Sequence, residues 1–169
     1  MQMNQEYRPL PSINGLPLAL YRAGQVRSME LHAIETFGIA GETLMERAGA
    51  FTYEMIRKRW PDAGDITFLC GTGNNGGDGH VIARQAREEG LRVRILQLGD
   101  SSRMTEYTRT NAERCFQAGV RTEIFCCLPD KTDLIVDAML GTGLDRPVGG
   151  LWAEAIQSVN RHSAPVVAV

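Results

Sequence analysis

From residue 65 onward, short apolar runs alternate with segments that carry apolar residues at helical spacing. The runs cover residues 65–70, 92–98, 121–125, 133–138 and 165–169, and the helical segments cover residues 79–89, 105–117 and 151–161. This alternation predicts an α/β fold in which helices cover both faces of a mostly parallel sheet, giving three αβα layers. Because crossover connections are right-handed, a doubly wound strand order of 3-2-1-4-5 is favoured.

Two more helices are predicted before the first strand, at residues 25–37 and 42–60. A chain of 169 residues with 43% hydrophobic content is long enough for one well-cored domain and too short for two ordinary ones. We therefore expect an N-terminal tail at residues 1–20 and one domain at residues 21–169. The two early helices carry more apolar surface than one sheet face needs, which raises the expectation of a homodimer.

Composition argues against several classes of protein. The formal charge of -2 and the lack of a dense Lys/Arg run are untypical of a nucleic-acid-binding protein. No stretch approaches the roughly 18 apolar residues of a membrane span, so no membrane partner is expected. The four cysteines form no C-x-x-C pair, which favours reduced thiols in a cytoplasmic protein. The three histidines lack zinc-ligand spacing and are expected at the surface or as hydrogen-bonded core residues.

Two glycine-rich loops mark the expected ligand site. In a doubly wound sheet, ligands bind beyond the carboxyl ends of the strands where the strand order reverses, here between the first and the fourth strand. The loops that follow those strands, residues 71–78 and 139–150, lie in the sequences CGTGNNGGDG and LGTGLDRPVGG. Both place G-T-G directly after a strand, so two permissive backbones should face each other across one crevice.

The first loop is neither a phosphate loop nor an ordinary dinucleotide fingerprint. Gly77 and Asp78 replace the Lys and Ser/Thr of a P-loop, and Asp78 puts a carboxylate where a pyrophosphate would bind. The carboxamides of Asn74 and Asn75 offer donors and acceptors to a ligand. In the structural alternative, the Asn-Gly pair makes a tight turn and Asp78 caps the next helix. The position at the switch point favours the functional interpretation.

Asp137 ends the fourth apolar run and should reach the mouth of the crevice. With Asn75 opposite, it could offer oxygen ligands to a monovalent cation, since Ca²⁺ and Mg²⁺ usually require more carboxylates. A solvated aspartate at a strand end is an equally good interpretation. In the second loop, Asp145 and Arg146 could contact a polar substrate or simply pair with each other.

Three segments, in this order, closely resemble the YjeF N-terminal domain family of NAD(P)H-hydrate epimerases. They are VRSMELHAIETFGIAGETLMERAG, CGTGNNGGDGHVIAR and DLIVDAMLGTGLDRP, and the likeness runs from about residue 21 to the last residue. The resemblance implies a Rossmann-like domain. It also implies an isomerase that interconverts the R and S forms of hydrated NADH and NADPH (NADHX and NADPHX), a form of nicotinamide nucleotide repair.

The resemblance also implies site residues, although it leaves the catalytic proton-transfer residue unassigned. A potassium ion would be bound by Asn75 and Asp137. The substrate would be contacted by Asn74, Asn75, Gly76, Gly77, Asp78, Gly141, Thr142, Gly143, Leu144, Asp145, Arg146 and Pro147.

The chain departs from the family at its C-terminal end. Family members continue after a strand like PVVAV into a D-I-P-S-G-L segment that binds substrate and potassium, whereas this chain stops at Val169. We therefore expect a truncated domain and weak or no activity from these 169 residues alone. Many bacterial relatives also carry an ADP-dependent dehydratase domain, fused or separate, and the sequence leaves open whether the parent gene encodes one.

Two other functions stay open. YjeF-like folds also serve as non-catalytic scaffolding or dimerisation modules, but the intact N-N-G-G-D-G and Asp137 speak against that reading. A conventional NAD(P)-dependent oxidoreductase is disfavoured by Asp78 and by the lack of a Tyr-Lys or Cys/His catalytic arrangement.

Overall fold

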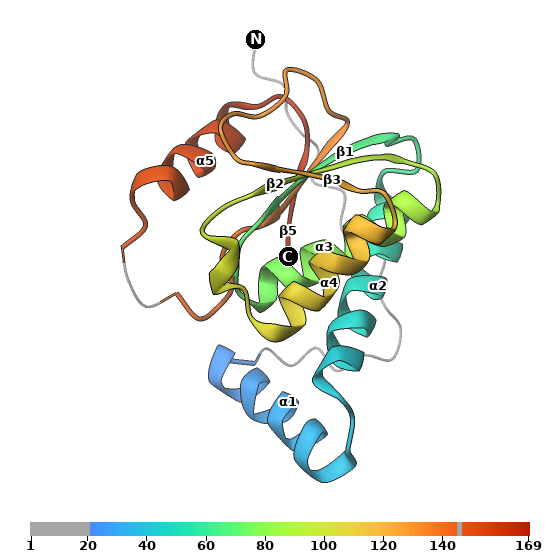
Figure 1. Cartoon of the computed structure of the whole chain (residues 1–169), viewed down its shortest axis with the longest axis vertical. Helices are drawn as coiled ribbons and strands as arrows, with labels where there is room; N and C mark the ends of the chain where they lie inside the picture. Colours follow the sequence, from blue (N-terminus) through green and yellow to red (C-terminus); the bar gives the residue numbers. More distant parts are fainter. Residues whose placement is uncertain (1–20, 145–146) are drawn as a thin grey trace.

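The computed structural model describes residues 21–144 and 147–169 and contains a parallel sheet flanked by helices on both faces (Figure 1). Its strands are β1 (Asp65–Cys70), β2 (Arg92–Gln97), β3 (Arg121–Ile124), β4 (Leu134–Ala138) and β5 (Val166–Ala168). The strand order is β3-β2-β1-β4-β5, and each pair of neighbours is parallel. The predicted fold class and strand order are confirmed. The predicted tail, residues 1–20, and Asp145 and Arg146 lie outside the described residues.

The helices follow the predicted plan with one addition. They are α1 (Ala23–Phe37), α2 (Gly41–Arg59), α3 (Asn74–Glu88), α4 (Glu106–Gln117) and α5 (Gly150–Arg161), with the short 3-10 helix η1 (Ser101–Arg103) after β2. Helices α2, α3 and α4 cover one face of the sheet, and α5 covers the other (Figure 1). Among the described residues, no helix combines the length and the apolar composition that a bilayer crossing requires.

Two apolar clusters form the core, one on each face of the sheet. Phe68 of β1 packs with Ile82 of α3 on one face, and the neighbouring Leu69 packs with Ala155 of α5 on the other. Phe68 and Leu69 are both fully buried. Since successive side chains of a strand point to opposite faces, a strand covered on both faces is mostly apolar. DITFLC fits this pattern, and its buried Thr67 donates a 3.0 Å hydrogen bond to the Thr132 hydroxyl.

Helix α3 begins at Asn74, five residues before the predicted start at residue 79. The prediction treated N-N-G-G-D as loop because glycine has a low helix propensity. Tight packing overrides that propensity here, because a Cβ atom at Gly76 would lie 2.0 Å from the carbonyl oxygen of Gly71, and one at Gly79 would lie 2.5 Å from Ala138 Cβ. The helix can approach the sheet this closely only without side chains at these positions.

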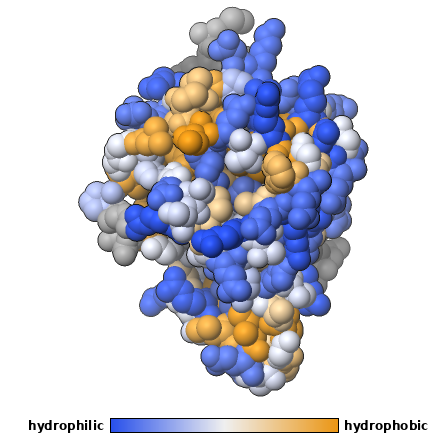
Figure 2. Space-filling model, in the orientation of Figure 1, coloured by the Kyte–Doolittle hydropathy of each residue, from blue (hydrophilic) through white to orange (hydrophobic). Residues whose placement is uncertain are grey.

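Helix α1 stands apart from the sheet and packs chiefly against α2 (Figure 1). It contains no buried residue. Figure 2 shows an apolar patch at the lower end of the molecule, where α1 lies in Figure 1. The exposed large apolar side chains of α1 are Val26, Met29, Leu31 and Phe37.

Candidate functional site

The segments that follow β1 and β4 meet at the carboxyl edge of the sheet. Cys70 pairs with Ala138 at the ends of the two strands, and the Gly71 amide donates a 3.0 Å hydrogen bond to the Ala138 carbonyl oxygen. A Cβ atom at Gly71 would lie 2.1 Å from the Met139 carbonyl oxygen. The two backbones therefore touch at the switch point, as the strand order requires, and only glycine fits at Gly71.

The two adjacent asparagines have different surroundings. The Oδ1 atom of Asn74 accepts a 2.8 Å hydrogen bond from the hydroxyl of Thr105, the N-cap residue of α4. The side chain of Asn75 instead lies against the second loop, since a Cβ atom at Gly141 would be 3.2 Å from Asn75 Cβ. The buried Nδ2 atom of Asn75 has no hydrogen-bond partner among the described residues. The Asn74 side chain thus links α3 to α4, whereas the Asn75 amide is free to hydrogen-bond a ligand.

Asp137 lies near the end of β4 and is half-buried. Its Oδ1 atom accepts a 3.0 Å hydrogen bond from the Met139 amide. Burial raises the pKa of the carboxyl group, and the Met139 amide opposes that rise. One carboxylate oxygen is thus committed to the backbone turn, and the other is available to a ligand.

A monovalent cation fits the donor set of Asn75 and Asp137. Both side chains offer oxygen atoms, and the amide of Asn75 can turn to present its oxygen because its nitrogen is not held. Within residues 21–144 and 147–169, no group of three or more His, Cys, Asp or Glu side chains is placed to hold a metal ion. The described residues therefore match a weakly charged oxygen site better than a typical divalent one.

Asp78 lies in the second turn of α3, whose N-cap residue is Gly73, so the structural alternative in which Asp78 caps this helix does not hold. Asp78 is half-buried. Burial and, secondarily, the negative charge of Glu30 on α1 raise the pKa of its carboxyl group to about 7. At neutral pH this group therefore exchanges a proton readily, unlike an ordinary aspartate.

Helix α1 brings two charged side chains close to the glycine-rich segments. Neither side chain was identified from the sequence. Glu30 lies near Asp78, and the Nη2 atom of Arg27 lies 3.4 Å from the position of a Cβ atom at Gly143. Both residues belong to the first of the three family-like segments, three positions apart. That spacing places them on one helix face, which was the available signal.

The remaining predicted site residues divide into a buried and an exposed group. Gly76 and Gly77 are buried, and a Cβ atom at Gly77 would lie 2.6 Å from Met45 Sδ, so a side chain there would displace Met45. The exposed group consists of Gly141, Thr142, Gly143, Leu144 and Pro147. Asp145 and Arg146 lie outside the described residues.

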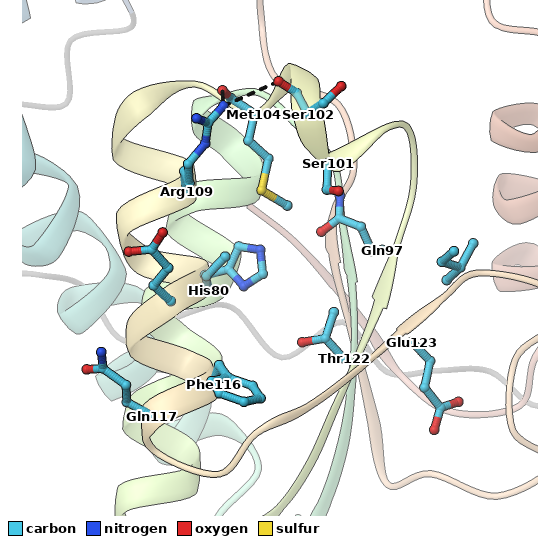
Figure 3. Close-up of a pocket in the computed structure, with 13 residues that line it drawn as sticks. His80, Gln97, Ser101, Ser102, Met104, Arg109, Phe116, Gln117, Thr122 and Glu123 are labelled. Carbon is cyan, nitrogen blue, oxygen red and sulfur yellow. Dashed lines mark hydrogen bonds between the residues drawn. The ribbon is translucent and has the colours of Figure 1, made fainter.

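A cavity of about 770 Å³ lies away from the two glycine-rich segments, between α4 and β3 (Figure 3). None of its lining residues belongs to either glycine-rich loop. Exposed Phe116 and Ile124 line it, and the imidazole of His80 lies at its inner end. His80 is fully buried without a hydrogen-bond partner for either ring nitrogen among the described residues, which differs from the predicted surface or hydrogen-bonded histidine. Burial lowers its pKa to about 4, so the ring is neutral at pH 7.

Comparison with known proteins places both loops within one family. The model of the YjeF-related protein N-terminus matches residues 41–169. The chain is 40% identical over 147 residues to the NAD(P)H-hydrate epimerase of Limosilactobacillus fermentum, a match that covers 87% of this chain and 71% of that protein. It is 36% identical over 155 residues to the bifunctional NAD(P)H-hydrate repair enzyme Nnr of Escherichia coli, covering 91% of this chain and 30% of that protein.

A solved structure agrees on the fold. The crystal structure of yeast ynu0 superposes with a TM-score of 0.80, covering 90% of this chain and 70% of that one. Because the two sequences are only 22% identical, this likeness bears on the fold alone. The family match, in contrast, spans most of the chain, from α2 through both glycine-rich loops to Val169. The chain therefore belongs to the family of the YjeF-related protein N-terminus.

Proposed function

We propose that this protein is an NAD(P)H-hydrate epimerase, an isomerase that interconverts the R and S forms of hydrated NADH and NADPH. The observation that carries the proposal is the 40% identity, over 87% of this chain, to a relative with that name. The family match includes both loops of the crevice at the switch point. The dinucleotide is then a substrate and no hydride is transferred, which agrees with the imperfect dinucleotide fingerprint.

Epimerisation at the hydrated carbon needs reversible loss and return of the hydroxyl group, or ring opening. Either route requires proton transfer and stabilisation of developing charge. We assign the proton transfer to Asp78, which lies one helical turn after Asn74 and Asn75 on α3. Its carboxyl pKa of about 7 suits a group that must both give and take a proton at neutral pH.

The substrate contacts are assigned to the residues around this carboxyl group. The Asn75 amide, which has no partner among the described residues, can orient the hydrated ring, and the exposed second loop can close the opposite side. We propose that the oxygens of Asn75 and Asp137 also hold a potassium ion. That ion would supply fixed positive charge beside the substrate.

The setting of the enzyme is part of the proposal. We place it in the cytoplasm as one domain at residues 21–169, and we expect α1 to contribute its apolar side chains to a homodimer. Relatives from Escherichia coli and Leishmania braziliensis are named bifunctional repair enzymes, and this chain spans 30% of each. We propose that an ADP-dependent dehydratase, fused or separate, consumes the S form.

The test follows interconversion of the R and S hydrates by chromatography, using the full-length gene product. We expect acceleration well above the spontaneous rate. Intact NADH serves as the control substrate, because an oxidoreductase would consume it and an epimerase would not. Absence of acceleration by well-folded protein would contradict the enzymatic proposal and favour the non-catalytic module.

A further inference from the structure

The charged face of α1 spans both halves of the crevice. Arg27 reaches the second loop, where its Nη2 atom lies 3.4 Å from the position of a Cβ atom at Gly143. Glu30, one turn later on the same helix face, is close enough to Asp78 in the first loop to act on its charge. Helix α1 contains no buried residue, so an apolar core contact does not account for its position.

Arg27 makes no ion pair with any described residue, and Glu30 does not pair with it although the spacing would allow this. Some arginines are committed to the fold, as Arg84 is through its ion pairs with Glu46 and Glu88, and Arg27 is not one of them. The guanidinium of Arg27 thus faces the crevice with its donors available.

The substrate of the proposed reaction carries a pyrophosphate, and the crevice needs a positive group to receive it. The carboxylates of Asp78 on α3 and Asp137 on β4 border this site and repel a phosphate. Apart from Arg146, which lies outside the described residues, the loop segments 71–78 and 139–150 contain no Lys or Arg. Among the described residues, a positive group for the phosphates must therefore come from another element, and α1 supplies one.

We propose that Arg27 binds the pyrophosphate of the hydrated dinucleotide and that α1 thereby forms a wall of the substrate site. The inference rests on the proposed function. A guanidinium can donate two parallel hydrogen bonds to one phosphate, which fixes the dinucleotide as well as attracting it. Because the phosphates lie far from the reacting carbon, Arg27 contributes to binding and leaves the chemical step to Asp78.

Kinetics of the full-length protein distinguish this role from a structural one. We expect Arg27→Ala to raise KM for the hydrate by roughly 10- to 100-fold with kcat changed less than about twofold, as for the loss of a charged hydrogen bond. Arg27→Lys should recover part of the loss, since it keeps the charge without the planar fork. Arg87→Ala, at an exposed position near the far end of α3, is the matched control and should leave both parameters unchanged.

A binding measurement separates failure of this inference from failure of the proposed function. ADP-ribose keeps the pyrophosphate and lacks the nicotinamide, so its affinity can be titrated calorimetrically without any reaction. We expect the wild type to bind ADP-ribose, and Arg27→Ala to bind it about tenfold or more weakly, with a smaller dependence on salt. Equal binding by the wild type and Arg27→Ala, or no binding by the wild type, would overturn the inference. Weaker binding by the variant would uphold it even if no epimerisation occurred.

Discussion

The two glycine-rich segments at the carboxyl edge of the sheet are alike in sequence and different in structure. After β1, Gly71 and Gly76 are buried against backbone, and a Cβ atom at Gly76 would lie 2.0 Å from the Gly71 carbonyl oxygen. After β4, Gly141 and Gly149 are exposed, and a Cβ atom at Gly149 would meet nothing within 4 Å. Glycine thus permits close backbone packing at Gly71 and Gly76, whereas the surroundings of Gly149 leave room for a side chain.

Because of this difference, we assign the two segments different roles in the proposed site. The packed segment runs from Gly71 into the first two turns of α3, and it holds Asn75 and Asp78 at fixed positions on a helix. The exposed segment is reached from outside by Arg27 of α1. The packed segment can hold reactive groups in a fixed orientation, and the exposed segment can admit the substrate. An enzyme that binds a large dinucleotide needs both properties.

We expect the largest effect on stability from a substitution in the packed segment. Gly76→Ala would force a methyl group into the Gly71 backbone, so we expect a loss of about 3 kcal/mol in the free energy of unfolding or failure to fold. Gly149→Ala is the matched change in the exposed segment and should cost less than about 1 kcal/mol, since Gly149 is the N-cap residue of α5 and has no close neighbour. Urea denaturation of both variants measures the difference. Equal stability of the two would show that the segments do not differ in packing.

The next effect tests the cation site between the segments. Asp137→Ala removes a proposed potassium ligand, and we expect the epimerisation rate in potassium buffer to fall by at least about tenfold. The wild type should lose a similar factor when potassium is replaced by a large organic cation, whereas the variant should not respond to the replacement. A wild-type rate that does not depend on potassium would refute the cation assignment.

A smaller effect concerns the proton-transfer group on the packed side. The folded-state pKa of Asp78, about 7, lies above the model value of 3.8, so the folded protein binds this proton more tightly than the unfolded chain. Ionisation of Asp78 therefore destabilises the fold progressively between about pH 4 and pH 7, and fully above that range. We expect Asp78→Asn to be as stable as the wild type near pH 4 and about 1–2 kcal/mol more stable at pH 8, after discounting for partial exposure.

The contribution of α1 to this effect can be isolated with two further variants. Glu30→Gln removes the neighbouring charge and should recover a minor part of the same stabilisation at pH 8, because burial is the larger cause. Glu35→Gln, at an exposed position on α1, is the control. Chemical denaturation at pH 4 and pH 8 provides the comparison. An Asp78→Asn variant that is less stable than the wild type at pH 8 would contradict the raised pKa.

The sheet was predictable because a parallel strand covered on both faces is mostly apolar. DITFLC and the run Leu134–Ala138 follow this pattern with Thr67 and Asp137 as polar exceptions, and the order of strands follows from right-handed crossovers. The start of α3 was not predictable from propensity, because Gly76 and Gly79 are helical only through contacts with Gly71 and Ala138. Local preference and tertiary packing conflict at this point, and packing prevails.

The residues of the site could be predicted only in part, because some of them reach it through long-range packing. Asn75 and Asp137 could be assigned to the crevice because each is near the end of a strand that borders the switch point. Arg27 and Glu30 could not, since their place depends on how α1 folds back across the two loops. The unpartnered imidazole of His80 also depends on long-range packing, because nothing in its sequence neighbourhood distinguishes it from a surface histidine.

The most direct test of the crevice as the reactive site compares a variant there with a variant in the cavity between α4 and β3. Epimerisation of the hydrates would be measured for full-length Asn75→Ala, at the crevice, and Phe116→Ala, on the wall of the cavity in Figure 3. We expect Asn75→Ala to lose about 100-fold in rate, as when an oriented amide is removed from an active site, and Phe116→Ala to keep the wild-type rate. A loss in Phe116→Ala with full activity in Asn75→Ala would place the reaction in the other cavity and contradict the assignment.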